Sequence, residues 1–447
     1  MILTTELLKQ MIDDTLGVKN MNTVTMNFSL RSHEDPSFEI KDIIVDGIQI
    51  IQDFSKNLTD DITVSINLQQ ETIMELVKHQ TLLYATIILE YIDRSDDSVV
   101  LDEPPVIYVY KVFIHDLTNL AKKVGINNIY NTDNEEIVTE AVASGLMPVT
   151  LQLISEDHYL INKSAFVGML KDATVADAIK FISSKSGIKS LNLIEPDNHV
   201  VYRHLMIPPQ YWEFSIIFEF LQQHYGVYNK GINYYIDHEI LYVYPPKETK
   251  PDKSPELEVI KTPPMSYIGS NNYHEITSAE GDITIVSTGN SIHQTLSNIA
   301  TENEGNANLF LNSDQMVDGQ MNYPTMELNN IGATASNVLA TSIHKKSAIP
   351  TYTEPTINTF DRASKLSGIN TELIALGWSY ARLFVFYPGM PVTYIYDEKD
   401  NVMSKKGILE HVTYTMLRGG NISSKPKYTV NSTLILRLGL DAEIYEV

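Results

Sequence analysis

The residues of this chain that could perform hydrolysis occur only as fragments of known motifs. Ser-x-x-Lys occurs at Ser186–Lys189 and at Ser342–Lys345, but the companion motifs that a serine acyl enzyme of this type needs are missing. His238-Glu239 begins like a zinc-protease helix, yet the second histidine of H-E-x-x-H does not follow. Neither a phosphate-binding G-x-x-x-x-G-K-[ST] loop nor G-x-S-x-G is present. We therefore predict no catalytic residue and no enzyme activity.

Metal and cofactor chemistry finds equally little support. The chain has no cysteine, which removes disulfides, thiolate zinc sites and a cysteine nucleophile together. Asp93, Asp96 and Asp97 are close in sequence but lack the glycine and the distal glutamate of an EF-hand loop, so a solvated turn is the better interpretation. The 12 histidines are scattered without a ligand-like spacing. We predict no metal site, no cofactor-binding residue and no cofactor.

Tyrosines gather in one short segment, and two roles are open to them. They are Tyr225, Tyr228, Tyr234, Tyr235, Tyr242 and Tyr244. Tyrosine is favoured at protein interfaces because it joins a large apolar area to a polar tip. Aromatic side chains also suit strands, and on that ground we favour packing in a core over partner binding.

The segment around these tyrosines has the pattern of a small α+β unit. Thr174-Val-Ala-Asp177 is a capping box that begins a helix, and Gly187 ends it. A second helix is expected after Pro208-Pro209, with Gly226 as its stop. Strands are expected at 232–236 and 240–244, and Asp237-His238 is typical of the turn between them.

The segments before and after this unit show the two-residue alternation of apolar and polar residues that is typical of strands. Apolar and polar residues alternate in strands from 22 to 117, and again at 391–396, 407–416 and 432–438, which are expected to form a meander. Residues 147–155 also alternate, and they belong either to the first strand set or to the next domain. A helix is expected within 1–19, and a connection with helical character at 118–146.

Residues 251–350 differ in composition from the rest of the chain. A charged Pro/Lys/Glu segment leads into a tract rich in Asn, Ser, Thr and Gly with isolated apolar pieces. Such a tract buries little apolar surface of its own, so it is a linker or an extended arm ordered by neighbouring subunits. We favour the arm and expect that deleting 262–345 spares the isolated fold and weakens assembly.

Composition narrows the possible partners. The 447 residues suggest two to four domains, and a net charge of −23 disfavours stable nucleic-acid binding, because few phosphate contacts can form. No apolar run approaches the roughly 18 residues needed to cross a bilayer. The segment 1–17 lacks the basic region of a secretory signal.

The order of elements in two segments points to a known family. LMIPPQYWEFSIIFEFLQQHYGVYNKGINYYIDHEILYVYPP at 205–246 and YPGMPVTYIY with GILEHVTY after 386 resemble the baseplate hub proteins of contractile-tailed bacteriophages. The resemblance implies an α+β, mostly β fold with two tail-tube-like antiparallel barrels. The expected domains are 1–155 (helix and first barrel), 156–250 (small α+β domain), 251–350 (linker or arm) and 351–447 (second barrel).

The resemblance also implies a function. Three chains with two barrels each would form a homotrimeric ring between the sixfold tail tube protein above and the threefold spike protein below, beside other baseplate (wedge) proteins. DNA would pass through the channel without stable binding. The protein would be assembled in the host cytoplasm and reside in the virion. Two alternatives stay open: a tail-associated cell-wall hydrolase, and the equivalent hub of a tailocin or secretion apparatus.

Overall fold

The structure is a computed structural model, and it describes most of the strands and the small domain. The described residues are 22–35, 37–41, 43–55, 57–79, 83–93, 105–114, 146–161, 166–208, 214–229, 231–246, 255–261, 275–277, 282–287, 291–295, 316–317, 320–321, 371–379, 381–398, 401–418, 426–439 and 441–445.

Strands far outnumber helices among these residues. The strands are β1 (Asn22–Ser32), β2 (Glu39–Ile40), β3 (Val45–Asp53), β4 (Asp61–Gln69), β5 (Leu83–Asp93), β6 (Val106–Ile114), β7 (Leu146–Ile154), β8 (Gly168–Ala173), β9 (Ser190–Leu193), β10 (Tyr202–Ile207), β11 (Asn233–Asp237), β12 (Ile240–Tyr244), β13 (Leu257–Lys261), β14 (Glu275–Thr277), β15 (Ile283–Ser287), β16 (Ile292–Thr295), β17 (Met316–Val317), β18 (Gln320–Met321), β19 (Thr371–Ser379), β20 (Pro391–Glu398), β21 (Asn401–Arg418), β22 (Lys427–Gly439) and β23 (Glu443–Ile444). The helices are α2 (Gln70–Lys78), α5 (Glu156–Ile161), α6 (Val175–Ser186) and α7 (Phe214–His224).

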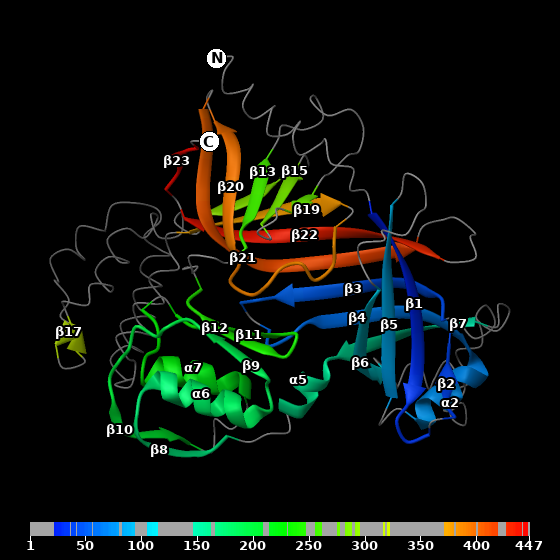
Figure 1. Ribbon diagram of the computed structural model, residues 1–447, viewed down its shortest axis with the longest axis horizontal. Coiled ribbons are helices and arrows are strands. Elements are labelled where there is room, and N and C mark those ends of the chain that lie inside the picture. Colours follow the sequence, from blue (N-terminus) through cyan, green and yellow to red (C-terminus); the bar gives the residue numbers. More distant parts are fainter. Residues whose placement is uncertain are drawn as a thin grey trace, which may run out of the picture.

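The largest sheet closes on itself. Antiparallel pairing runs through β1, β5, β6, β7, β4, β3, β21 and β22, and β22 pairs with β1 again at Val24↔Tyr428 and Thr25↔Lys427. We call this set the strand circuit. It joins the two ends of the chain, because β1 to β7 come from the first third and β21 and β22 from the last (Figure 1). A closed sheet leaves no edge along this path.

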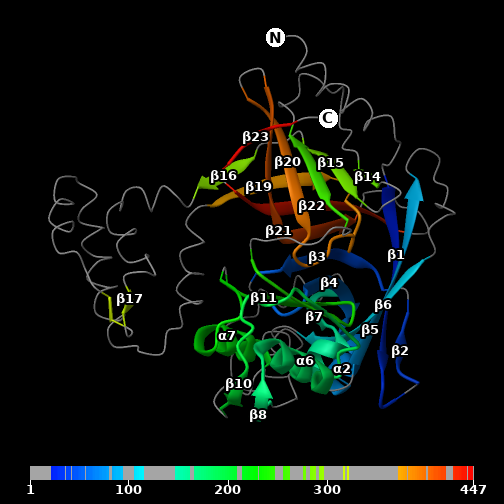
Figure 2. The same ribbon diagram turned by 60° about the vertical axis from the view of Figure 1, so that its left-hand side comes forward.

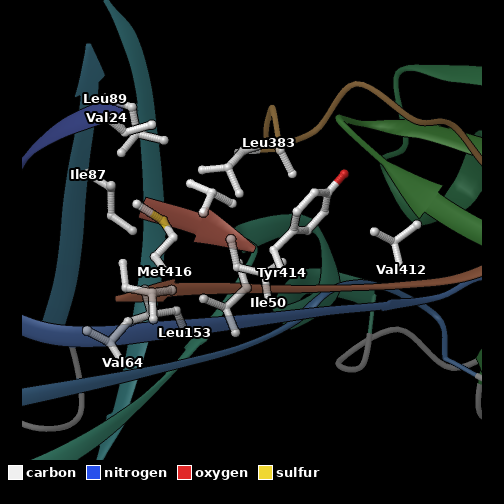
Figure 3. Packing of buried hydrophobic residues seen from close by; sticks show 14 of the residues in the cluster. Val24, Ile50, Val64, Ile87, Leu89, Leu153, Leu383, Val412, Tyr414 and Met416 are labelled. Atoms are coloured by element: carbon white, nitrogen blue, oxygen red, sulfur yellow. The ribbon is translucent and has the colours of Figure 1, made fainter. Parts of the chain in front are cut away.

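Apolar side chains, which alternate with polar ones along the strands, fill the interior of the strand circuit. β4 alternates buried and less buried residues along its length, as expected for a sheet with one packed face. Figure 3 shows side chains from several strands directed into a common interior, among them Val24, Ile50, Val64, Ile87, Leu89, Leu153, Val412 and Met416. The circuit is therefore a packed core rather than an open pore.

β21 and β22 extend beyond the strand circuit into a second sheet region. Along one edge, β21 pairs with β20 as far as Ile408 and with β3 from His411 onwards. At the same point, its pairing with β22 on the other edge shifts register, between Leu409 and His411. β22 continues onto β19, while β20 continues onto β13 and β15 through parallel pairs. A bulge of this kind bends a strand and changes its partner. The long β21–β22 ladder is thus shared by both sheet regions.

The small domain is a compact α+β unit below the large sheet in Figures 1 and 2. α6 and α7 pack on the sheet β11-β12-β9, and β8 and β10 form a separate pair. α6 begins with the expected capping box, in which Thr174 and Asp177 bond each other's backbone N–H groups, and ends at Gly187 with φ of 84°. Gly226, with φ of 79°, follows α7.

Several expectations from the sequence are confirmed. The meander is present as β20, β21 and β22, and the capped helix and the 233–244 hairpin lie where they were predicted. The open question about 147–155 has an answer: β7 pairs with β4 and β6 and belongs to the strand circuit. The limits of the four predicted domains stay a prediction, to which the structure adds that the first and last parts share one circuit of strands.

The structure departs from the expected arm in two segments. β13 and β15 lie within the tract assigned to a linker or arm, yet Leu257, Val259 and Ile285 are fully buried in the large core. Deleting 262–345 would remove β15, so this deletion is not expected to spare the fold, contrary to the prediction. The helix predicted in 1–19, the connection at 118–145 and most of 296–370 lie outside the described residues.

Gly407 offers a direct test of the shared ladder. A Cβ atom at this position would lie 2.0 Å from the Arg437 carbonyl oxygen and 2.8 Å from the Leu438 Cα, both backbone atoms that cannot move aside. We expect Gly407→Ala to lower the free energy of unfolding by at least about 2 kcal/mol. Gly377→Ala is the matched control, since its Cβ would meet nothing closer than 4.0 Å. Urea unfolding of both variants measures the difference, and equal stability would contradict the tight approach.

Candidate functional site at the junction of the strand circuit and the small domain

The strand circuit and the small domain exchange one buried side chain each. The connection between β3 and β4 leaves the circuit, and its Leu58 is buried in the core of the small domain. In return, Tyr235 of β11 is buried in the core of the large sheet. Because each part fills a space in the other, separation would expose apolar surface on both sides.

Hydrogen bonds to main-chain groups hold the connection between β3 and β4 in place. Ile236 N–H donates to the Leu58 carbonyl at 2.8 Å, and the Tyr244 hydroxyl donates to the Phe54 carbonyl at 3.0 Å. The Phe54 ring meets Tyr235 edge-on with ring centroids 4.9 Å apart. Phe54 N–H also donates to the Glu410 carbonyl at 3.0 Å, at the β21 bulge. One short connection therefore contacts the circuit, the small domain and the shared ladder.

Asp60 is the half-buried acid of this junction. Tyr235 Oη at 2.5 Å and Gln52 Nε2 at 3.0 Å both donate to the same carboxylate oxygen, Oδ1. Burial raises the pKa of Asp60 to about 6, although these two hydrogen bonds act in the opposite direction, and the nearby Asp237 raises it further. The site therefore holds a carboxyl group that changes protonation near neutral pH.

Two ring-bearing side chains, Tyr108 and His238, lie close enough to Asp60 to interact with it electrostatically. Tyr108 of β6 packs against Phe384 with ring centroids 4.7 Å apart, and His238 meets the same Phe384 ring edge-on at 5.9 Å. The bond to Asp237 raises the pKa of His238, and burial opposes this shift. Desolvation raises the pKa of Tyr108 above 10. The Tyr108 hydroxyl therefore stays protonated at neutral pH and is not a proton-transfer group there.

The turn between β11 and β12 places His238 at this site. His238 and Glu239 have φ of 45° and 67°, the left-handed values that a two-residue type I′ hairpin turn requires. The interpretation of Asp237-His238 as turn chemistry is confirmed. Lys189 also reaches this turn and pairs with Glu239 at 2.5 Å on the surface.

The geometry suits attachment better than catalysis. A nucleophile next to a base, or two carboxylates facing an open cleft, would be needed for hydrolysis. Asp60 instead is half-buried and accepts hydrogen bonds from two neutral donors. In the part of the chain that the structure describes, no group of three or more His, Asp or Glu side chains is arranged to hold a metal ion.

The other residues considered in the sequence do not form a site. Ser186 donates to the Ser183 carbonyl, and Lys189 is bound to Glu239, so the two form no acyl-enzyme pair. Ser342, Lys345, Asp96 and Asp97 lie outside the described residues. Among the tyrosines, Tyr228, Tyr235 and Tyr244 are buried, which confirms core packing for these three. Tyr235 and Tyr244 also bridge the junction, a role that their spacing did not reveal.

Asp60 was missed by reasoning from the sequence. It lies in the polar segment NLTDD, which has the composition of an exposed turn. The apolar Leu58 inside that segment was the one available signal of burial.

No helix within the described ranges is long and apolar enough to cross a membrane.

These features define the chain as a mostly β protein whose parts are joined by a shared ladder and an interlocked junction. The family model of the Bacteriophage PBS1 gene 109 protein matches residues 12–322, more than half of the chain. The chain belongs to this bacteriophage family. The match confirms the phage origin that the resemblance implied. No curated protein matches the chain.

Solved structures of tail proteins resemble the chain distantly. A tail protein from Neisseria meningitidis MC58 is 11% identical, with coverage of 92% of this chain and 96% of that chain and a TM-score of 0.41. The 43 kDa tail protein of prophage MuSo2 from Shewanella oneidensis is 7% identical, with coverage of 93% and 96% and a TM-score of 0.38. The E. coli c3393 protein, a component of the type VI secretion system described as similar to T4 tail proteins gp27 and gp5, is 9% identical, with coverage of 93% and 77% and a TM-score of 0.36.

Replacing Asp60 by Asn tests the half-buried acid. The folded-state pKa of about 6 lies above the ordinary 3.8, so the folded protein binds a proton more tightly than the unfolded chain. Ionised Asp60 therefore lowers the free energy of unfolding, fully so above pH 6. This destabilisation disappears as the pH falls towards 4 and the carboxylate binds a proton. Asn keeps an oxygen for Tyr235 and Gln52 and does not titrate. We expect Asp60→Asn to be more stable than the native protein at pH 8, by up to about 3 kcal/mol, and equally stable near pH 4.

The measurement is urea unfolding of both proteins from pH 4 to pH 8. Groups that do not interact with Asp60 cancel in the difference, whereas His238, whose pKa Asp60 helps to raise, contributes to it. A difference that does not change with pH would show that Asp60 does not titrate in this range.

Proposed function

We propose that the protein is a structural subunit of a phage tail baseplate hub. Three copies form a ring that joins the sixfold tail tube to the threefold central spike and leaves a channel for DNA. Membership of a bacteriophage family supports the viral setting. The protein acts by holding its partners together, and its place is the virion baseplate after assembly in the host cytoplasm.

The observation that carries the proposal is the shared β21–β22 ladder. It joins a closed strand circuit to a second sheet region within one polypeptide. Two sheet regions per chain let three chains offer six comparable surfaces, which is what an adaptor between sixfold and threefold partners requires. The hub sequence pattern at 205–246 and after 386 supports the same assignment.

The outer face of the strand circuit carries a candidate contact between copies. Ile107 and Val109 of β6 are 62% and 43% exposed, and Ile107 lies opposite the partly buried Ile88 of β5. The outer face of an antiparallel sheet is normally polar, so apolar side chains there favour burial against another protein. In a ring, a neighbouring copy covers this face.

Charge fits passage of DNA better than its capture. The net charge of −23 per chain provides few counterion-releasing contacts with phosphates. Tail tube, spike and wedge proteins are the proposed partners. Among the described residues, no arrangement of side chains favours the alternative of a cell-wall hydrolase.

Native mass spectrometry of the purified chain, with and without tube protein, tests the ring. We expect a species of three chains, and Ile107→Lys should raise its dissociation constant at least about tenfold, because a charge is then buried in the contact. The monomer should lose less than about 0.5 kcal/mol of stability, as is usual for an exposed position. Gln49→Lys, on the outer face of β3, is the matched control and should leave the trimer intact. A chain that stays monomeric with the tube protein would refute the hub assignment.

A further inference from the structure

A groove on the small domain is separate from both the junction and the outer face of β6. It lies between the start of β8 and the second half of α6, with a volume of about 580 Å³. Its lining is Phe166, Val167, Gly168, Met169, Leu170, Phe181, Ile182, Lys185 and Ile207. Figures 1 and 2 both place β8 and β10 at the end of the small domain that points away from the large sheet.

The floor of the groove is packed, and its rim is apolar and exposed. Ile182 and Ile207 are buried, whereas Val167, Met169 and Phe181 are 54%, 56% and 45% exposed. Met206 of β10 lies directly opposite Met169 and is also exposed, so the apolar rim continues across the strand pair. A cluster of large apolar side chains of this kind around a hollow marks a binding surface.

β8 offers main-chain groups as well as side chains. Within the described residues it pairs only with β10, so its second edge has no strand partner there, and its residues 168–170 line the groove. At Gly168 a Cβ atom would meet nothing within 4 Å, which leaves the backbone open to an approaching chain. A free edge beside a side-chain pocket is the arrangement that binds an extended peptide by strand addition.

The charge at the groove is cationic. Lys185 is the one charged residue of the lining, and no carboxylate in the described part of the chain pairs with it. Its Nζ lies 5.8 Å from the centre of the Phe181 ring, so the two side chains stand side by side on α6. In a chain with a net charge of −23, a lysine without a carboxylate partner beside an apolar pocket favours an acidic group on the ligand.

The spacing defines the ligand further. Phe181 and Lys185 are four residues apart on a helix, a rise of about 6 Å. Residues two apart on a strand point to the same face and are about 6.6 Å apart. We propose that this groove binds an extended segment of a partner protein, added as a strand to β8. An apolar residue of that segment enters the pocket at Phe181, and an acidic residue two positions later pairs with Lys185.

A synthetic peptide tests the proposal without knowledge of the natural partner. The probe is fluorescein-labelled Ser-Val-Thr-Leu-Thr-Glu-amide, in which Val, Leu and Glu share one face. The control, Ser-Val-Thr-Leu-Glu-Thr-amide, has the same composition but turns the glutamate to the other face. Fluorescence anisotropy should show saturable binding of the probe with a Kd of about 0.1–1 mM and weaker binding of the control.

Substitutions at α6 separate the groove from general charge. Lys185→Glu should weaken the probe roughly fivefold and favour the peptide with Lys in place of Glu. Lys180→Glu is the matched control, because Lys180 is exposed on the same helix but does not line the groove, and it should change nothing. Equal effects of the two substitutions, or equal binding of both peptides, would overturn the proposal.

Hydrogen exchange identifies the edge that is used. Bound peptide should slow exchange of backbone amides within 168–173, as strand addition requires. Protection only elsewhere would overturn the assignment to β8. If the same amides become protected as the protein concentration rises without peptide, a second copy occupies the groove, and the assignment to a partner protein is wrong. Neither result depends on whether the chain forms a hub ring.

Discussion

The β21–β22 ladder is the constraint on which the rest of this structure depends. Four strands of the large sheet pair with it at these points: β3 and β1 close the circuit, while β20 and β19 begin the second region. The change of partner occurs at Glu410, where Arg437 of β22 donates to the Glu410 carboxylate from Nε at 3.1 Å and from Nη2 at 2.6 Å. A two-point bond of this kind fixes orientation as well as distance. The bulge is therefore held in place and is not a loose irregularity.

The same position links the ladder to the small domain. The Glu410 carbonyl accepts from Phe54, whose connection carries Leu58 into the small-domain core. Small shifts at the bulge would therefore move the connection, and with it the bonds from Ile236 and Tyr244. Buried polar groups are costly when they lose partners. Asp60, with two donors on one oxygen, adds a cost of this kind to any displacement of β11.

Reasoning from the sequence found the elements whose signal is local. Each of these signals occupies only a few consecutive residues: the alternation in β4, the capping box of α6 and the glycine after α7. The positions of these elements could therefore be predicted. Pairing between Val24 and Tyr428 joins residues from opposite ends of the chain, and no local pattern specifies that partner. β13 and β15 were missed because five-residue apolar segments in a polar tract look like isolated pieces. β13 pairs with β20, which lies more than a hundred residues later, and β15 pairs with β13.

The distribution of polar groups separates the surfaces that hold the chain together from those left free for partners. At the junction, the half-buried Asp60 and the buried Tyr235 and Tyr244 have hydrogen bonds within the chain. At β6 and at the β8 groove, large apolar side chains are exposed to water. A rigid internal junction keeps these surfaces at fixed positions relative to each other. Binding a partner then requires little further ordering of the chain, so it costs less conformational entropy. The proposed hub role would use both features: hydrogen-bonded contacts inside the chain, and exposed apolar surface that other chains could cover.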